Sequence, residues 1–97
     1  MKYITDISVD KITVYQDFTG KYDDFVKDRV LAYLRAFKAS GFTSQPVIDA
    51  FTGEMVAGAD NGYTDGVYIW YESEVYYFEK YDLALTKDFL DYVVAVA

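Results

Sequence analysis

The stretch Thr64-Asp65-Gly66-Val67-Tyr68-Ile69-Trp70-Tyr71 constrains the fold more than any other part of the chain. Its first three residues predict a tight turn, because Gly66 can adopt the positive φ that such turns often require. The residues after the turn then alternate, with Tyr68 and Trp70 on the opposite side from their neighbours. We therefore expect a turn leading into a strand that carries the only tryptophan, with the later part of the chain covering that strand.

An amphipathic helix is predicted in the N-terminal half. Asp23 is suited to be its N-cap, and Gly41 is predicted to end it. Acidic residues near the start and Arg35 and Lys38 near the end match the helix dipole. The apolar residues form one stripe at helical spacing: Val26, Val30, Tyr33, Leu34 and Phe37.

Two shorter helices are predicted in the C-terminal part. Ser73 is the expected N-cap of a helix over residues 74–81, with Val75 and Phe78 facing inward. Thr86 is the expected N-cap of a last helix. The apolar stripe of that helix is Phe89, Leu90, Val93, Val94 and Ala97.

The remaining segments predict short strands and loops. Alternating residues over 3–9 and 11–15 predict a hairpin, and residues 47–50 and 55–57 predict two strands joined by a turn. Residues 58–62 are expected to form a loop. The predicted fold of residues 1–97 is a single α+β domain, in which one long helix and two short C-terminal helices pack on a small antiparallel sheet or meander.

Composition excludes several kinds of functional site. The chain has no cysteine and no histidine, which removes thiolate nucleophiles, histidine-based triads and the usual zinc sites. We expect no cofactor and no metal. The first residues lack the apolar segment of a signal peptide, and no apolar run approaches the ~18 residues needed to span a membrane. A cytoplasmic location without membrane contact is therefore predicted.

Negative charge is concentrated in the C-terminal part of the chain. The formal net charge is −7, and no Lys or Arg occurs from Phe42 through Glu79. Such a surface repels nucleic acid and attracts a basic protein. Direct nucleic-acid binding is therefore disfavoured, and a protein partner with a basic surface is expected.

Tyrosines are interleaved with the carboxylates in the same part of the chain. Aromatic side chains are favoured in binding hot spots, and surrounding carboxylates steer a basic partner. Trp70 itself is interpreted as a core residue. The predicted partner-binding residues are Asp60, Tyr63, Asp65, Tyr68, Tyr71, Glu72, Glu74, Tyr76, Tyr77 and Glu79.

The same residues partly match two other kinds of site. Asn61 to Glu72 matches a calcium loop at some positions, but Tyr63 and Ile69 occupy two of the ligand positions. Carboxylate pairs for acid–base catalysis would be Asp60 with Asp65, or Glu72 with Glu74. An enzyme is not predicted; it would require a concave pocket with converging carboxylates of raised pKa.

The pattern Thr64-Asp65-Gly66-x-Tyr68-x-Trp70, followed by Tyr76-Tyr77-x-x-x-Tyr81-x-Leu83-x-Leu85-x-x-x-Phe89, resembles that of small uncharacterised bacterial proteins. The resemblance extends over residues 28–93 and implies a shared fold but no activity.

The leading functional hypothesis is an acidic binding module that neutralises the basic functional surface of a partner. An immunity protein against a nuclease-type toxin fits this hypothesis, as does a phage-encoded inhibitor that mimics nucleic-acid charge. The alternatives are a homo-oligomerising structural domain and, less favoured, a carboxylate-dependent enzyme.

Overall fold

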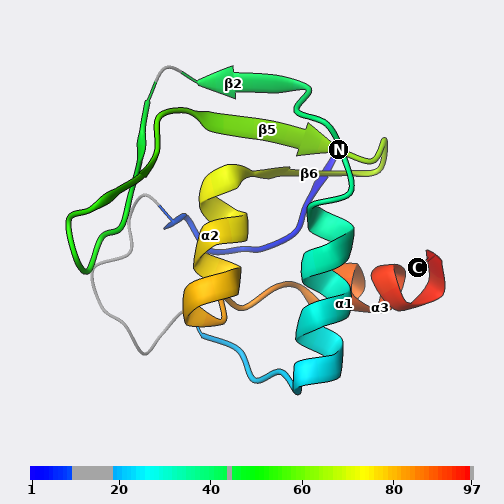
Figure 1. Ribbon diagram of the computed structural model, residues 1–97. Helices are drawn as coiled ribbons and strands as arrows, with labels where there is room; N and C mark the ends of the chain where they lie inside the picture. Colours follow the sequence, from blue (N-terminus) through cyan, green and yellow to red (C-terminus); the bar gives the residue numbers. More distant parts are fainter. Residues whose placement is uncertain (10–18, 44, 97) are drawn as a thin grey trace.

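A four-stranded sheet and a separate two-stranded hairpin form the β part of the structure, which is a computed structural model describing residues 1–9, 19–43 and 45–96 (Figure 1). The sheet has the order β1-β6-β5-β2, in which β1 runs parallel to β6 and the other pairs are antiparallel. The strands are β1 (Lys2–Tyr3), β2 (Gly41–Thr43), β3 (Val47–Ile48), β4 (Met55–Ala57), β5 (Asp60–Thr64) and β6 (Tyr68–Tyr71).

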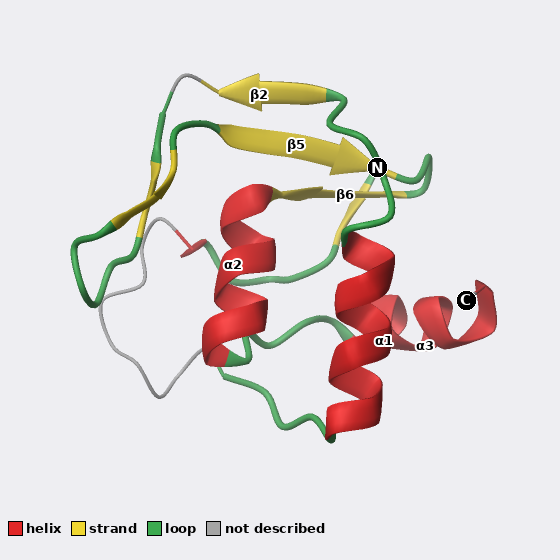
Figure 2. Ribbon diagram, viewed as in Figure 1, coloured by secondary structure: helices red, strands yellow, loops and turns green. Residues whose placement is uncertain are grey.

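The helices of the described residues lie below strands β2, β5 and β6 in the view of Figure 2. They are α1 (Asp24–Leu34), α2 (Glu72–Tyr81) and α3 (Lys87–Val96), and α1 contacts both of the others. This arrangement confirms the predicted α+β class. None of the helices described is long and apolar enough to cross a membrane.

The predicted turn and strand at residues 64–71 are confirmed. Gly66 has a φ of +95°, and the Asp65 carboxylate accepts hydrogen bonds from the amides of Val67 (2.9 Å) and Tyr68 (2.7 Å). Trp70 is fully buried, and its indole N–H donates to the Leu34 carbonyl at the end of α1 (3.2 Å). The tryptophan is therefore a core residue that joins β6 to α1.

Helix α1 begins as predicted but ends earlier. Asp23 is the N-cap, and its side chain accepts from the amide of Val26 at 2.8 Å. The helix ends at Leu34, whereas Gly41 begins β2, so the predicted stop at Gly41 is wrong. Leaving the helix there allows the Phe37 ring to pack edge-on against Trp70, with ring centroids 5.6 Å apart.

The predicted strand over residues 3–9 is wrong beyond Tyr3. Residues 2–3 pair with β6, after which the backbone turns to the connector between α2 and α3. The Ile4 carbonyl accepts from the Thr86 amide (2.8 Å), and the Thr5 hydroxyl donates to the Ala84 carbonyl (2.6 Å). Ile4 and Thr5 are therefore hydrogen-bonded to the connector between α2 and α3 and do not continue a strand. The predicted partner strand over residues 11–15 lies outside the described residues.

The predicted loop over residues 58–62 is confirmed at residues 58–59 and wrong from Asp60, because Asp60–Thr64 forms β5, an inner strand of the sheet. Gly62 pairs with Gly41 on one side and Tyr71 on the other. A Cβ atom at Gly62 would lie 3.4 Å from the Tyr71 ring. Gly62 therefore allows the neighbouring strands to approach closely. The sequence of β5 lacks the apolar alternation of a typical strand, which is why a loop was predicted.

The two C-terminal helices occur where they were predicted, with one different cap. The N-cap of α2 is Tyr71 rather than Ser73. Thr86 caps α3 as predicted, accepting from the Phe89 amide at 3.2 Å. Of the predicted stripe, Phe89 and Val93 are fully buried, Val94 is exposed, and Ala97 lies outside the described residues.

Candidate functional site

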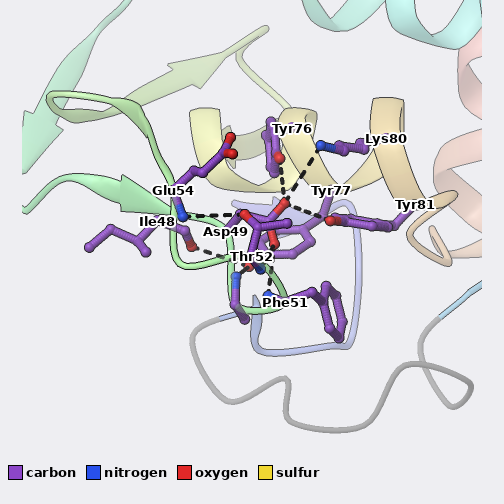
Figure 3. A network of polar contacts seen from close by, with 10 residues as sticks. Ile48, Asp49, Phe51, Thr52, Glu54, Tyr76, Tyr77, Lys80 and Tyr81 are labelled. Carbon is purple, nitrogen blue, oxygen red and sulfur yellow. Dashed lines mark hydrogen bonds and ion pairs between the residues drawn. The ribbon is translucent and has the colours of Figure 1, made fainter.

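Asp49, the residue after β3, is completely buried between the β3–β4 hairpin and α2 (Figure 3). Its Oδ1 atom accepts hydrogen bonds from the amides of Phe51 (2.7 Å) and Thr52 (3.0 Å). Its Oδ2 atom accepts from the hydroxyls of Tyr76 (2.5 Å) and Tyr81 (2.6 Å). We call these five residues the Asp49 network.

The network keeps Asp49 ionised despite its burial. Burial would raise the pKa of the carboxyl group, but the hydrogen bonds from two tyrosines and two amides outweigh burial and hold the pKa below its ordinary value. Burial and the bond to Asp49 raise the pKa of Tyr76 to about 12. The carboxylate is thus occupied by the protein itself, and its role is to hold the hairpin on α2.

Further contacts fix the hairpin in the same place. The Tyr77 hydroxyl accepts from the Ala50 amide (2.9 Å) and donates to the Ile48 carbonyl (3.3 Å). The rings of Phe51 and Tyr81 pack edge-on, with centroids 4.9 Å apart. Helix α2 therefore positions the hairpin through three tyrosines along its length, Tyr76, Tyr77 and Tyr81.

A cleft of about 910 Å³ lies beside the fixed hairpin. The N-terminal segment forms one wall, the start of the hairpin another, and the junction of β5, β6 and α2 the third. We call it the acidic cleft, because its described lining has three carboxylates, Asp6, Asp60 and Glu74, and no Lys or Arg. The lining residues are Tyr3, residues 5–9, residues 45–48, Asp60, Tyr71, Ser73, Glu74 and Tyr77.

Two of these carboxylates lie at the N-terminus of α2. Asp60 accepts from both the amide (2.9 Å) and the hydroxyl (3.0 Å) of Ser73. Glu74 accepts from the Tyr71 amide through Oε1 (2.9 Å) and has only 8% of its surface exposed. Burial, helped by the charge of Asp60, raises the pKa of Glu74 to about 7, whereas the bond from Tyr71 opposes this increase.

The structure places the predicted partner-binding residues in several different surroundings. Asp60, Tyr71, Glu74 and Tyr77 meet in the acidic cleft, although Glu74 and Tyr77 are largely buried there. Tyr68 is 3% exposed and belongs to the core.

The other predicted residues are bonded within the chain. Tyr63 donates to Glu72 (3.0 Å), and Arg35 lies 3.9 Å from Glu72 and 2.8 Å from Glu79. The Asp65 carboxylate accepts from Tyr33 at 2.5 Å, and Tyr76 donates to Asp49. The fold brings these carboxylates next to hydroxyl groups and to Arg35. The spacing of the residues along the sequence does not predict these pairs.

The predicted carboxylate pairs are also separated. Asp60 and Asp65 flank β5 at its two ends, about 16 Å apart along a strand that rises 3.3 Å per residue. Glu72 lines a different, smaller cavity of about 100 Å³ with Arg35 and Tyr63, away from Glu74. The pair in the cleft is instead Asp60 with Glu74. The residues of the calcium-loop alternative form most of β5, the turn after it, β6 and, at Glu72, the first residue of α2.

Sequence reasoning missed Asp49 and the N-terminal wall of the cleft. Asp49 carried a signal, because an acid directly after the apolar pair Val47-Ile48 and before Phe51-Thr52-Gly53 is typical of a side chain that accepts from turn amides. No sequence pattern identifies Tyr3 and Asp6 as residues of the site. Comparisons with protein-family models, with curated proteins and with solved structures find no match to this chain, so the candidate site rests on its own geometry.

Proposed function

We propose that this chain is an acidic binding module that neutralises a protein partner by binding its basic functional surface. One observation carries the proposal: the acidic cleft has three carboxylates and no Lys or Arg among its described lining residues. A cleft lined by one sign of charge attracts a partner of the opposite sign and raises its association rate. The formal net charge of −7 on the whole protein adds to that attraction at long range.

The rim of the cleft supplies contact area as well as charge. Tyr3 is 65% exposed and Ile48 is 50% exposed, and both line the cleft. Met55, on the other strand of the hairpin, is 67% exposed. Apolar and aromatic anchors beside a charged centre are typical of protein-binding surfaces. An immunity protein against a nuclease-type toxin, or an inhibitor that mimics nucleic-acid charge, would use such a surface in a bacterium or a phage.

A capture experiment with matched charge changes tests the proposal. The double variant Asp60→Asn/Glu74→Gln removes two charges from the cleft, and Asp24→Asn/Asp88→Asn removes two exposed charges from the first turns of α1 and α3. We expect wild type and the second variant to retain the same basic proteins from host lysate, released by salt, and the cleft variant to lose them. Equal capture by all three would contradict the proposal, provided that circular dichroism shows them folded.

A carboxylate-dependent enzyme is the second candidate. A carboxyl group with a pKa of about 7 beside a second carboxylate in a cleft suits general acid–base catalysis. Turnover of chromogenic glycosides by wild type, abolished by Glu74→Gln alone, would favour the enzyme over the binding module.

A further inference from the structure

Glu74 lacks a positively charged neighbour among the described residues. Its Oε1 atom accepts from the Tyr71 amide, which caps the helix start. Oε2 has no hydrogen-bond donor among the described residues and is not fully buried, so it is open to the cleft. The ion pairs formed in the described chain involve other carboxylates. A carboxylate that is nine-tenths buried without a counter-charge is energetically unfavourable. A bound cation would relieve that cost.

Asp60 is held in a fixed position next to this group. Both of its carboxylate oxygens accept from Ser73, the residue before Glu74. A ligand therefore meets two carboxylates already oriented at the start of α2, and the protein does not have to rearrange its own ion pairs to bind. Preorganisation of this kind lowers the cost of association.

The cleft around the two carboxylates matches an organic cation with an apolar stem. Its volume of about 910 Å³ is within the range of ligand-binding pockets. The tyrosine rings of Tyr3, Tyr71 and Tyr77 line it, and aromatic faces attract cations. Pro46, Val47 and Ile48 give an apolar wall along which the methylene groups of a long basic side chain pack.

We infer that the Asp60–Glu74 end of the acidic cleft binds a single guanidinium or primary ammonium group, presented on a basic side chain of the partner. This inference rests on the proposed function and names the part of the partner that the cleft recognises. Asp60 and Glu74 supply the charge, the tyrosines enclose the cationic head, and the apolar wall contacts the stem.

Binding of the cation depends on the ionisation of Glu74. The other titratable groups facing it across the cleft are Tyr3, Asp6, Asp60, Tyr71 and Tyr77. With a Glu74 pKa of about 7, the ionised fraction increases ~10-fold between pH 6 and pH 8. Affinity for the cation is therefore expected to increase with pH over this interval.

An NMR titration with side-chain analogues tests the inference. The probes are N-acetyl-arginine methylamide, N-acetyl-lysine methylamide and the neutral isostere N-acetyl-citrulline methylamide, with Ca²⁺ and Mg²⁺ as further arms. We expect one or both cationic probes, but not citrulline, to shift the amide resonances of residues 45–48 and 71–74. Comparison of the arginine and lysine arms identifies the preferred head group.

Variants and pH separate the site from general electrostatic attraction. At pH 8, Glu74→Gln and Asp60→Asn should each weaken binding of the cationic probe at least fivefold, whereas Asp88→Asn on α3 should leave it unchanged. Wild type should bind more weakly at pH 6 than at pH 8, and Glu74→Gln should lose this pH dependence. The pH series on wild type stands even if one variant does not fold.

Several results would overturn the inference. Equal binding of citrulline, binding of divalent metal ions only, or unchanged affinity in both cleft variants would each do so. If the probes fail but capture of basic proteins still depends on the cleft, the single-cation site is wrong and the proposed function stands. If the probes bind but basic proteins are not captured, the site stands and the proposed function is wrong.

Discussion

At the scale of single residues, the tyrosines of this chain serve as internal hydrogen-bond donors to its carboxylates. Tyr76 and Tyr81 donate to Asp49, Tyr33 to Asp65, and Tyr63 to Glu72. A hydroxyl group that donates to a carboxylate stabilises the charge while its ring fills the core. This pairing accounts for much of a tyrosine content that the sequence alone suggested was a docking surface.

The Asp49→Asn substitution should destabilise the protein strongly. Asn keeps the shape of the side chain but replaces one accepting oxygen by an NH₂ group that faces two tyrosine hydroxyls, which disrupts a buried network. We expect a loss of about 2–4 kcal/mol in the free energy of unfolding, measured by urea denaturation at pH 7. Glu54→Gln, an exposed change on the same hairpin, should cost less than about 0.5 kcal/mol. A comparable effect of both variants would show that the network contributes little.

At the scale of elements, the sequence predicted correctly those features that depend only on neighbouring residues. The N-caps Asp23 and Thr86 and the turn at Gly66 were predicted because a cap or a turn depends on neighbouring residues only. The pairing of β1 with β6 and the strand β5 were not predicted. Strand β1 has only two residues, and β5 contains Asp60-Asn61-Gly62, whose pairing depends on distant partners. The acidic cleft was missed for the same reason. Its walls come from three segments that are far apart in the sequence, within residues 3–9, 45–48 and 60–77.

The β3–β4 hairpin should open independently when its ties to α2 are cut. It does not belong to the four-stranded sheet, and the Asp49 network holds it on α2. In Tyr76→Phe/Tyr81→Phe the Asp49 carboxylate keeps its two backbone donors and loses both hydroxyls. Hydrogen exchange of the hairpin amides of Asp49 and Gly53 should become at least ~10-fold faster, because each 1.4 kcal/mol of lost local stability gives a factor of ten.

The control for this experiment is Tyr63→Phe, which removes a hydroxyl bonded to Glu72 on a different part of α2. Exchange at the hairpin should then remain at the wild-type rate. Equal acceleration throughout α1, β5 and β6 in the double variant would indicate global unfolding, and would contradict an independently opening hairpin.

At the scale of the whole molecule, the fold redistributes the charge imbalance along the chain. Lys27 and Arg35 from the N-terminal part pair with Asp82 and with Glu72 and Glu79 from the acidic part. These pairs offset part of the negative charge that the sequence concentrates in the C-terminal part of the chain. The three carboxylates of the acidic cleft form no ion pair among the described residues, so their charge is not compensated in this way.

The pH dependence of global stability should report the unpaired Glu74. Its pKa is about 7 in the folded protein against an ordinary value of 4.5, so the folded state binds more protons than the unfolded state between these values. Stability contributed by the protonated group is therefore lost as the pH rises from about 4.5 to above 7, by about 3 kcal/mol at 1.36 kcal/mol per pKa unit.

The Glu74→Gln variant removes this loss of stability while keeping an oxygen that accepts from the Tyr71 amide. The variant should equal wild type near pH 5 and exceed its free energy of unfolding by about 2–3 kcal/mol at pH 8, measured by urea denaturation. Asp49 does not obscure this result, because its lowered pKa places its own loss of stability in the acid range, as the pH falls below about 4. A variant less stable than wild type at pH 8 would mean that Glu74 already has its counter-charge within the folded chain, and the case for an external cation would be lost with it.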